Sequence, residues 1–480
     1  MWFAENISWR QFRRSLGAFS AIVCKDGSTV WAEDSNGKTI ASGESGVDDA
    51  GVIQSALDVA NKIYIKKETY IIKSSEAIGL IIKSNSEIIA EKGTIFKIAD
   101  NNPATDFQLL AVGADELNIL IRNLELDGNK ANNPDMTEGY GLTLNKCKNI
   151  VVENVIAHDF VREGFHVEGQ HITIRDCMTY NNGVAGIYFA SIQSIPKDVT
   201  IERHYSHDET EFVYLENSPS SAYDITIKNS YASDIEKAVF DHGEGAISLK
   251  IYDCVFENIK GDYGHEAVIL SGSNSEVKDC TIRTRLYTYI GGIFLGGQNN
   301  KAINNIIDDF HGAIKANNAI IKHNRCYNCN YAYKDGTGGN LVVDNEFHVT
   351  YRSIYHEGTL SSINYFINNY FSAPAVALDA TYDIFIGNRG EILDNNSGTA
   401  TFSGDGSTTD FEIGAHGLAI TDPSKIVVKI TPVSSDAIAA SPCVGYVDPA
   451  DNTKIRVKFA SAPASGTGNV KITWEAQVIS

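Results

Sequence analysis

The chain has 480 residues, enough for about two or three domains with a large buried core. Sixty acidic residues against 40 basic ones give a formal charge of −20, which argues against a nucleic-acid partner, because nucleic-acid-binding proteins present basic surfaces to phosphates. Hydrophobic residues at 43% describe a folded chain, and no apolar run approaches the roughly 18 residues of a membrane-spanning helix, so we expect no membrane insertion.

The first 45 residues are predicted to form a small head or packing segment, with a short helix over residues 8–16 and β runs at 21–23 and 30–32. The next element is a helix over residues 50–59, because apolar residues recur there at helical spacing after Asp48 and Asp49, which are typical of a helix start. The apolar residues of this helix are Val52, Ile53, Leu57 and Val59.

From residue 46 to 398 one unit recurs: an alternating strand, a polar turn, a second alternating strand, and an Asn or Asp before another short strand. Stacked coils of three short strands would pair each strand with its equivalents about 4.8 Å above and below, in parallel sheets. Asn and Asp suit the corners because they tolerate left-handed backbone angles. The shared corner positions are Asn123, Asn154, Asp176, Asn229, Asp253, Asp279, Asn305, Asn324, Asn345 and Asn369. The coil near Arg203 lacks an amide or acid at this position.

This repeat, together with the segment GVDDAGVIQSALDVANKIYIKKETYII at residues 46–72, resembles the right-handed parallel β-helix proteins of the pectate-lyase superfamily, including phage tailspikes. The resemblance implies an all-β fold of about 11–12 coils, in which the helix near residues 50–59 caps the open end of the solenoid. The tailspike likeness also implies a homotrimer. The fold hosts hydrolases, lyases, epimerases and binding proteins, so it does not by itself define an activity.

Alignment of the first strands of successive coils predicts which side chains point inward and which point outward. The inward set is Phe165, Val167, Ile187, Phe189, Val213, Leu215, Val239, Val268, Leu270, Ile293 and Leu295. The outward row is His166, Tyr188, Tyr214, Phe240, Ile269, Phe294, Lys315, Lys334 and Tyr355. Two residues further along, a second outward row includes Glu168, Ala190, Glu216 and His242.

A strip of aromatic residues beside carboxylates is what a sugar chain needs, because ring faces pack against pyranose C–H groups and carboxylates accept hydrogen bonds from hydroxyls. Glu168 and Glu216 lie two coils apart, about 9.6 Å by strand spacing, close to the ~6.5–9.5 Å of inverting glycosidases. The predicted catalytic residues are Glu168, Glu216 and His242. The predicted glycan-binding residues are His166, Tyr188, Tyr214, Phe240, Phe294, Asp208, Glu211 and Arg162. Outward residues of any β-helix are polar, however, so the strip also fits a purely structural surface.

No cofactor is required by this chemistry, and no metal site is predicted. His323, Cys326 and Cys329 offer three zinc-type ligands where a structural site wants four. Ca²⁺ would enter only with lyase chemistry, for which Arg162 would act beside Asp159, Asp208 and Glu211. Cys177, Cys254 and Cys280 follow the corner residue in their coils and are predicted to stack inside the solenoid.

Residues 399–480 change to a Thr-, Ser-, Gly- and Val-rich composition with alternating runs, which predicts a C-terminal β-sandwich.

The favoured function is recognition of a polysaccharide by an extracellular or virion-associated protein, with hydrolysis as its activity if it is an enzyme. One alternative is a secreted lyase or epimerase acting on uronate polymers, against which the negative charge argues. The other is a structural virion or surface-assembly protein.

Overall fold

The structure, a computed structural model, describes residues 19–190, 194–216, 224–242, 248–261, 266–284, 290–335, 337–356, 360–373, 383–390, 395–418 and 421–478. The chain divides into two compact units, Met1–Leu286 and Tyr287–Ser480. The helix predicted over residues 8–16 lies outside the described part, and the predicted domain boundaries near residues 45 and 398 stay predictions. No helix of the described ranges is long and apolar enough to cross a membrane.

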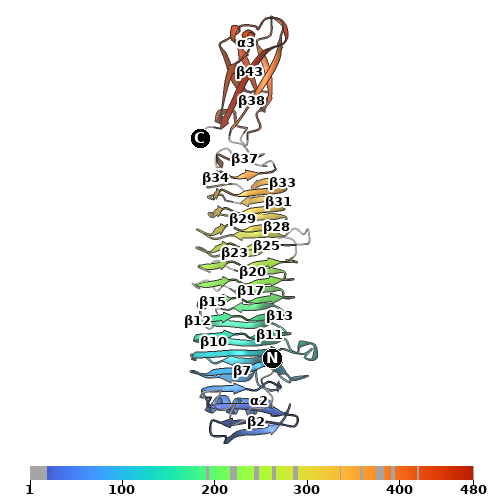
Figure 1. Ribbon diagram of the computed structural model, residues 1–480, viewed down its shortest axis with the longest axis vertical. Helices are drawn as coiled ribbons and strands as arrows, with labels where there is room; N and C mark the ends of the chain where they lie inside the picture. Colours follow the sequence, from blue (N-terminus) through green and yellow to red (C-terminus); the bar gives the residue numbers. More distant parts are fainter. Residues whose placement is uncertain are drawn as a thin grey trace, which may run out of the picture. The chain divides into compact units, whose positions relative to one another are not determined.

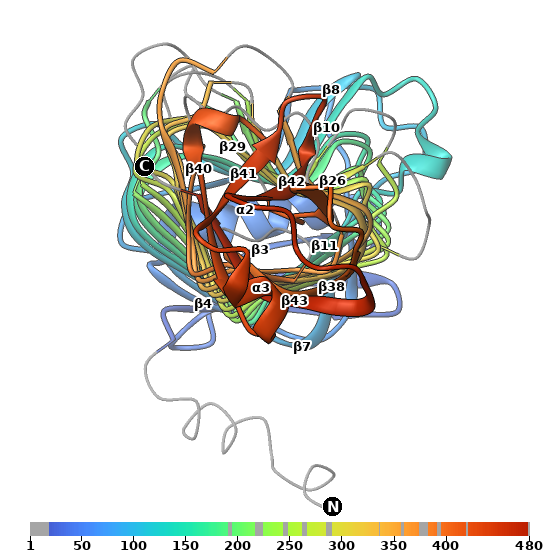
Figure 2. The ribbon, with the colours of Figure 1, turned by 90° about the horizontal axis from the view of Figure 1, so that it is seen from above.

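The first unit begins with three antiparallel strands, β1 (Ala21–Asp26), β2 (Thr29–Asp34) and β3 (Thr39–Glu44), followed by helix α2 (Asp49–Val59). Seen along the stack of strands, α2 crosses the middle of the ring that the coils outline (Figure 2). The buried carboxylate of Asp49 binds Lys25 Nζ at 2.6 Å and the Ile71 amide at 2.7 Å, which fixes the helix to β1 and the first coil. The predicted helix is confirmed, and it buries Val52, Ile53, Ala56 and Leu57, whereas Val59 at its end is 68% exposed.

Parallel strands then stack coil on coil (Figure 1). The alternating apolar residues of each strand give it one inward and one outward set of side chains, and the inward set fills the interior. The strands of this stack, with a 3-10 turn at Lys130–Asn132, are β4 (Lys62–Ile65), β5 (Thr69–Ile72), β6 (Ile78–Ile82), β7 (Glu87–Ile98), β8 (Asp106–Val112), β9 (Leu117–Asp127), β10 (Glu138–Glu153), β11 (Ile156–His158), β12 (Glu163–Arg175), β13 (Met178–Tyr180), β14 (Ala185–Phe189), β15 (Lys197–Glu202), β16 (Tyr205–His207), β17 (Glu211–Glu216), β18 (Ile225–Lys228), β19 (Tyr231–Ser233), β20 (Lys237–His242), β21 (Leu249–Tyr252), β22 (Val255–Glu257), β23 (Glu266–Leu270), β24 (Glu276–Lys278) and β25 (Thr281–Arg283).

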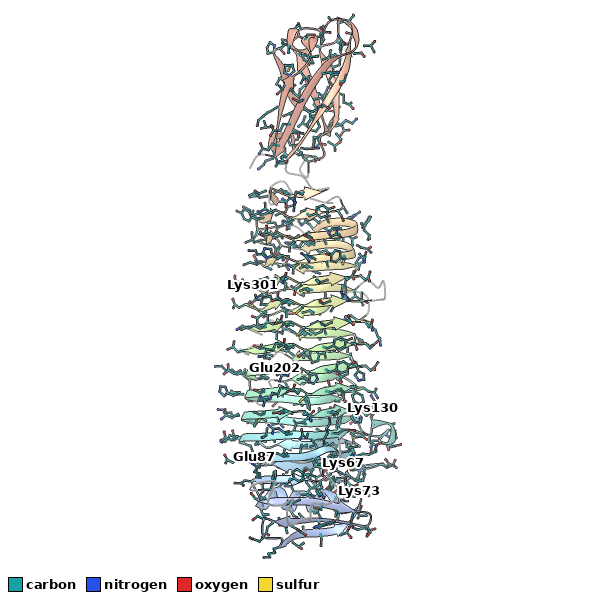
Figure 3. The ribbon with its side chains drawn as sticks, viewed as in Figure 1. Lys67, Lys73, Glu87, Lys130, Glu202 and Lys301 are labelled. Atoms are coloured by element: carbon teal, nitrogen blue, oxygen red, sulfur yellow. The ribbon has the colours of Figure 1, made fainter. Side chains whose placement is uncertain are left out.

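The predicted inward positions are confirmed, since every one of those residues is fully buried. Phe165, Ile187, Val213 and Val239 pair in register from β12 to β20, so equivalent side chains of successive coils pack directly on each other. Charged side chains such as Glu202 and Lys130 lie on the outside of the coils (Figure 3). This separation of apolar and charged side chains is what stabilises a solenoid without a single central core.

The predicted corner position of each coil in the first unit has a left-handed backbone. Asn154, Asp176, Asn229 and Asp253 have φ between 51° and 55°, as the repeat predicts. Arg203, in the coil that lacks an amide or acid, takes the same conformation with φ 50°. The next residue points inward, and there Cys177, Cys254 and Cys280 are buried free thiols, as predicted.

The second unit contains further parallel strands, in which the corner prediction is shifted by one residue. Asn304, His323, Asp344 and Asn368, each directly before a predicted corner, have left-handed backbones. The predicted corner residues Asn305, Asn324, Asn345 and Asn369 point inward and form a buried ladder of side-chain hydrogen bonds of 2.9 to 3.0 Å. The strands are β26 (Gly291–Leu295), β27 (Lys301–Ile303), β28 (Ile306–Asp308), β29 (Gly312–Ala316), β30 (Ile320–Lys322), β31 (Arg325–Asp335), β32 (Leu341–Val343), β33 (Glu346–His356), β34 (Asn364–Ile367), β35 (Tyr370–Phe371), β36 (Asp383–Ile386) and β37 (Arg389–Gly390).

The C-terminal residues form two three-stranded antiparallel sheets, β38-β43-β40 and β39-β42-β41. Val457 and Phe459 of one sheet pack against Val470 and Ile472 of the other, which makes the predicted sandwich. Its elements are β38 (Asn395–Gly404), β39 (Asp410–Ala415), β40 (Ile426–Pro432), α3 (Ser435–Ala439), β41 (Cys443–Asp448), β42 (Asp451–Phe459) and β43 (Gly466–Val478), with a 3-10 turn at Pro423–Lys425.

Candidate functional site

An outward row of side chains crosses the coils of the first unit. Thr143 on β10, His166 on β12, Tyr188 on β14, Tyr214 on β17 and Phe240 on β20 are in register. The ring centroids from His166 to Phe240 are 5.3, 5.0 and 5.1 Å apart, with interplanar angles of 24°, 29° and 41°. Because the rings face one another, they present mainly their edges outward, and Tyr188 is buried. We call the four residues from His166 to Phe240 the aromatic row.

A second outward row carries the two predicted catalytic carboxylates. Asn145 on β10 pairs with Glu168 on β12, and Glu216 on β17 pairs with His242 on β20. The register places Ala190 between Glu168 and Glu216, so the two carboxylates lie two coils apart, about 9.6 Å by strand spacing. The His242 side chain lies outside the described part of the chain, so only its backbone position is known.

Both carboxylates have neighbours in the aromatic row. Glu216 accepts a hydrogen bond from the Tyr188 hydroxyl, and burial together with this bond raises the pKa of Tyr188. Glu168 is only 2% exposed, and its Oε1 lies 3.6 Å from His166 Nε2. We call the second outward row, which contains Glu168 and Glu216, the carboxylate row. These contacts with Tyr188 and His166 therefore connect it to the aromatic row.

His166 is held between two buried carboxylates. Its Nδ1 lies 3.8 Å from Glu163 Oε2, on the side opposite Glu168. Burial by itself would lower the pKa of His166, but the two carboxylates raise it to about 9. His166 is therefore an imidazolium at neutral pH.

The other predicted glycan-binding residues lie in different surroundings. Arg162 Nη1 binds both oxygens of Glu138 at 2.8 and 3.1 Å, and its Nε and Nη2 reach Glu163 at 3.2 Å, so this guanidinium belongs to the cluster around His166. Glu211 pairs with Lys237 at 3.3 Å beside the far end of the aromatic row.

Asp208 lies outside this cluster, at an exposed corner where it binds His207 Nδ1 at 2.9 Å. Phe294 belongs to the second unit, in a row with Lys315, Lys334 and Tyr355. Of these predicted glycan-binding residues, Arg162 and Glu211 therefore lie beside the aromatic row. Asp208 lies at a separate corner, and Phe294 belongs to the second unit.

A cavity of about 150 Å³ opens where the aromatic row ends at His166. It is lined by Asp106, Gln108, Tyr140, Thr143, Asn145, His166 and Glu168. Sequence comparison missed the first five because the coil alignment began at Gly164. The preceding segment, Gly141 to Asn145, has the same Gly-apolar-x-apolar-polar pattern as Gly164 to Glu168 and could have revealed Thr143 and Asn145.

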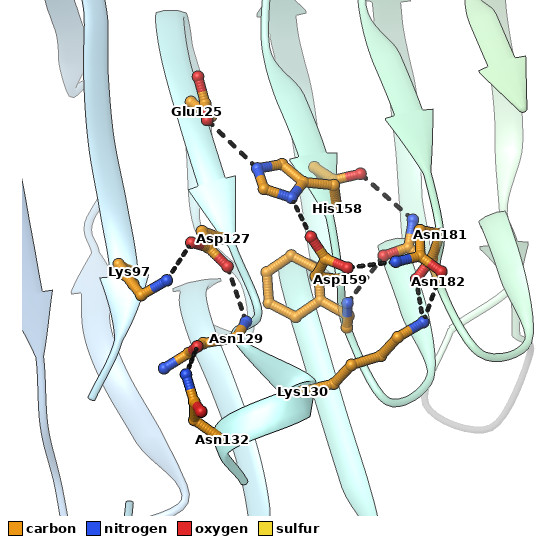
Figure 4. A network of polar contacts seen from close by, with 12 residues as sticks. Lys97, Glu125, Asp127, Asn129, Lys130, Asn132, His158, Asp159, Asn181 and Asn182 are labelled. Atoms are coloured by element: carbon orange, nitrogen blue, oxygen red, sulfur yellow. Dashed lines mark hydrogen bonds and ion pairs between the residues drawn. The ribbon is translucent and has the colours of Figure 1, made fainter. Parts of the chain in front are cut away.

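Polar residues also gather at the corner between β11 and β12 (Figure 4). His158 Nδ1 lies 2.7 Å from Asp159 and its Nε2 lies 3.2 Å from Glu125. Burial opposes the charged form, but these two contacts raise the pKa of His158. Asp127 is paired with Lys97 at 2.7 Å.

This corner is the candidate metal cluster among the described residues, because ligand atoms of Asp127, His158 and Asp159 lie within 4.8 Å of one another. Ca²⁺ takes six to eight oxygen ligands. An imidazole whose two nitrogens both contact carboxylates and a carboxylate paired with lysine do not fit that donor set. The residues drawn together for a lyase-type site also separate, since Glu211 pairs with Lys237 and Asp208 with His207.

No protein-family model matches the chain, and no curated protein matches it in sequence. Solved structures do match. The A-module of mannuronan C-5 epimerase AlgE4 from Azotobacter vinelandii is 17% identical with a TM-score of 0.53, over 66% of this chain and 97% of that module. The AlgE6 A-module from the same organism is 15% identical with a TM-score of 0.52, over 72% of this chain and 96% of that module.

A mutant tailspike protein of E. coli bacteriophage HK620, in complex with a pentasaccharide, is 11% identical with a TM-score of 0.54, over 90% of both chains. At such identities a likeness describes the fold and leaves the activity open. The chain is therefore a parallel β-helix protein, with the fold that phage tailspikes and mannuronan epimerase A-modules share.

Proposed function

We propose that this protein is an extracellular or virion-associated tailspike-type protein that binds a polysaccharide over the aromatic row and the carboxylate row of its first unit. The observation that carries the proposal is the cavity at the end of the aromatic row, beside the half-buried His166 and the buried carboxylate of Glu168. Sugar sites combine aromatic contact area with a few well-placed polar groups. A bacteriophage tailspike of the same fold, in complex with a pentasaccharide, is consistent with this proposal.

The activity we propose is hydrolysis, with Glu168 as general acid and Glu216 as general base. In an inverting glycosidase the acid protonates the leaving oxygen while the base removes a proton from the attacking water, and the two carboxylates are ~6.5–9.5 Å apart. The backbone separation of about 9.6 Å from strand spacing lies just above that range, within reach of small side-chain movements. Ala190, the small residue between the two carboxylates, leaves no long side chain in the place where the glycosidic oxygen and the water would meet.

One alternative has its own support. Tyr140, Arg162 and His166 lie together near the cavity, with the Arg162 guanidinium 5.8 Å from the Tyr140 ring centre and the His166 ring 5.4 Å from it. Cationic groups beside a tyrosine suit a lyase or epimerase that neutralises a uronate and moves its C5 proton. The excess of carboxylates around the same cavity opposes this alternative.

The test is a glycan array and a polysaccharide-degradation screen, run with wild type, Glu168→Gln and Glu216→Gln. We expect the wild type to bind and cleave a polysaccharide, and each variant to lose about 10²–10⁴-fold in cleavage rate while still binding, because each loses one proton-transfer group. Glu202→Gln is the matched control, since Glu202 is on β15 outside these rows and pairs with Arg203.

Cleavage that is unchanged in both variants would refute the catalytic assignment. An unsaturated product that absorbs ultraviolet light would establish the lyase alternative. An absence of binding and cleavage across a broad panel would instead favour a structural virion protein. We also propose a homotrimer, from the tailspike likeness, which light scattering of the purified protein tests directly.

A further inference from the structure

The aromatic row ends abruptly at His166. The next two positions in register are Thr143 and Ala111, neither of which carries a ring. The cavity lies at this end of the row, with Tyr140 at its side, whose ring is inclined 80° to that of His166. A space of about 150 Å³ holds one six-membered ring, as an engineered cavity of that size holds benzene. The cavity thus continues the row by one ring position.

Residues of the cavity wall carry buried polar atoms without a hydrogen-bond partner among the described residues. They are Gln108 Oε1 and Thr143 Oγ1. His166 Nδ1 and Glu163 Oε2 also lack a hydrogen bond, but they lie 3.8 Å apart and form an ion pair with each other. Thr143 itself is only 3% exposed. Buried polar atoms normally have partners, and a group of exceptions is typical of a site whose partners arrive with a ligand.

The charges around the cavity determine which ring it accepts. Asp106 and Glu168 line the cavity, and Glu138 and Glu163 lie just behind, so four carboxylates stand against the two cations Arg162 and His166. A ligand carboxylate would add to this negative excess. Hydroxyl or ammonium groups would instead donate to the amide oxygen of Gln108 and to the carboxylates.

We infer that this cavity is a subsite for one pyranose ring that bears no carboxylate, a neutral hexose or a hexosamine, and that it rejects uronates. The inference rests on the proposed glycan-binding function and adds the substrate class. The inference also distinguishes the proposed hydrolase from the alternative uronate lyase or epimerase. The ring in the cavity would lie next to Glu168 and would be the ring on which the enzyme acts, so a lyase or epimerase would need a uronate there.

Thr143→Phe tests the subsite directly, because an outward Phe at this position would extend the aromatic row and fill the cavity. The matched control is Thr173→Phe, since Thr173 is a half-buried outward residue in the part of β12 that pairs with β15, in register with Val151 and Thr200 and away from the cavity lining. The probes are neutral, hexosamine-containing and hexuronate oligosaccharides on an array, with titration calorimetry of those that bind. Melting temperatures of both variants show whether they are folded.

We expect the wild type to bind a neutral or hexosamine-containing probe, Thr143→Phe to bind it at least about 10-fold more weakly, and Thr173→Phe to bind it normally. We also expect Asp106→Asn to improve the binding of hexuronate probes relative to neutral ones. Equal binding by wild type and a folded Thr143→Phe would overturn the subsite and leave the proposed function standing. Binding of hexuronates alone by the wild type would overturn the substrate class, and no binding of any probe would overturn both proposals.

Discussion

Replacing His356 by glutamine is expected to destabilise the second unit, because it removes the cation from a buried charge cluster. His356 Nε2 lies 2.8 Å from Asp383 Oδ2, and its Nδ1 bonds Asp335. Both carboxylates are fully buried and His356 is 4% exposed. The Tyr333 hydroxyl also donates to Asp335, at 3.0 Å. Glutamine would remove the positive charge of the imidazolium from between the two buried carboxylates, at a cost of about 3–5 kcal/mol.

The pH dependence follows from the same contacts. Burial opposes the imidazolium, but the two aspartates raise the pKa of His356 from 6.5 to about 9. A raised pKa means that the folded chain holds this proton more tightly than the unfolded chain, so the stabilisation is fully present below pH 6.5 and is lost between pH 6.5 and 9. The difference corresponds to about 3 kcal/mol, or about 2 kcal/mol after an allowance for solvent screening.

Thermal unfolding followed by circular dichroism at about pH 6 and about pH 9.5 measures both effects. For a unit of this size 1 kcal/mol moves Tm by about 2–4 °C, so the variant should melt about 6–20 °C lower at the acidic pH, and the gap should narrow by about 4–8 °C at the alkaline pH. His323→Asn is the control, because the His323–Asp344 pair is 49% and 37% exposed and asparagine tolerates the left-handed backbone there. A gap between wild type and variant that is the same at both pH values would refute the reasoning.

Three further predictions concern the interior and the acidic corner. Burial raises the pKa of Glu209 to about 8, so the free energy of unfolding of the wild type should fall by up to about 4 kcal/mol between pH 4.5 and 8. Glu209→Gln should remove this fall. Parallel plots of Tm against pH for wild type and variant would contradict the prediction. Asn345→Ala interrupts the buried ladder and should lower the free energy of unfolding in urea by about 2–4 kcal/mol. The control Asn452→Ala, at an exposed position, should lower it by less than about 0.5 kcal/mol. Equal losses would show that the ladder is not a source of stability. EDTA should leave Tm and glycan binding unchanged, because both ring nitrogens of His158 are engaged by carboxylates, and a loss that Ca²⁺ restores would instead support the lyase alternative.

The β-helix was predictable because each coil repeats the same local requirement. A corner needs a residue that tolerates a left-handed backbone, and Asn and Asp supply it at Asn154, Asp176 and Asn229. The prediction slipped by one residue in the second unit, where two adjacent polar residues compete for the corner. At Asn304 and Asn305 the first residue turns the chain and the second joins the interior ladder, and residue type alone does not distinguish the two roles.

The direction of the side chains in the candidate site was predictable from alternation, but their burial was not. Tyr188 and Glu168 point outward as expected, yet both are buried. The rings about 5 Å away in the stack cover Tyr188. The cavity depends on a missing ring at Thr143, and this matters only once the register places Thr143 beside His166. A row of similar residues can be predicted from the sequence. The end of the row can be predicted only when the register with the neighbouring coil is known.

The buried charge cluster shows that inward rows contain a signal that can be used in advance. The coil alignment that puts Lys334 and Tyr355 outward also puts Asp335 and His356 inward, where most other coils have an apolar residue such as Val167 or Leu215. A charged residue at an inward position cannot reach water and must find a partner on an adjacent coil. Register places Asp335 directly beside His356, so the pair follows from the repeat itself. For Asp335 and His356, the two polar residues that break the apolar inward row on adjacent coils therefore predict their own contact.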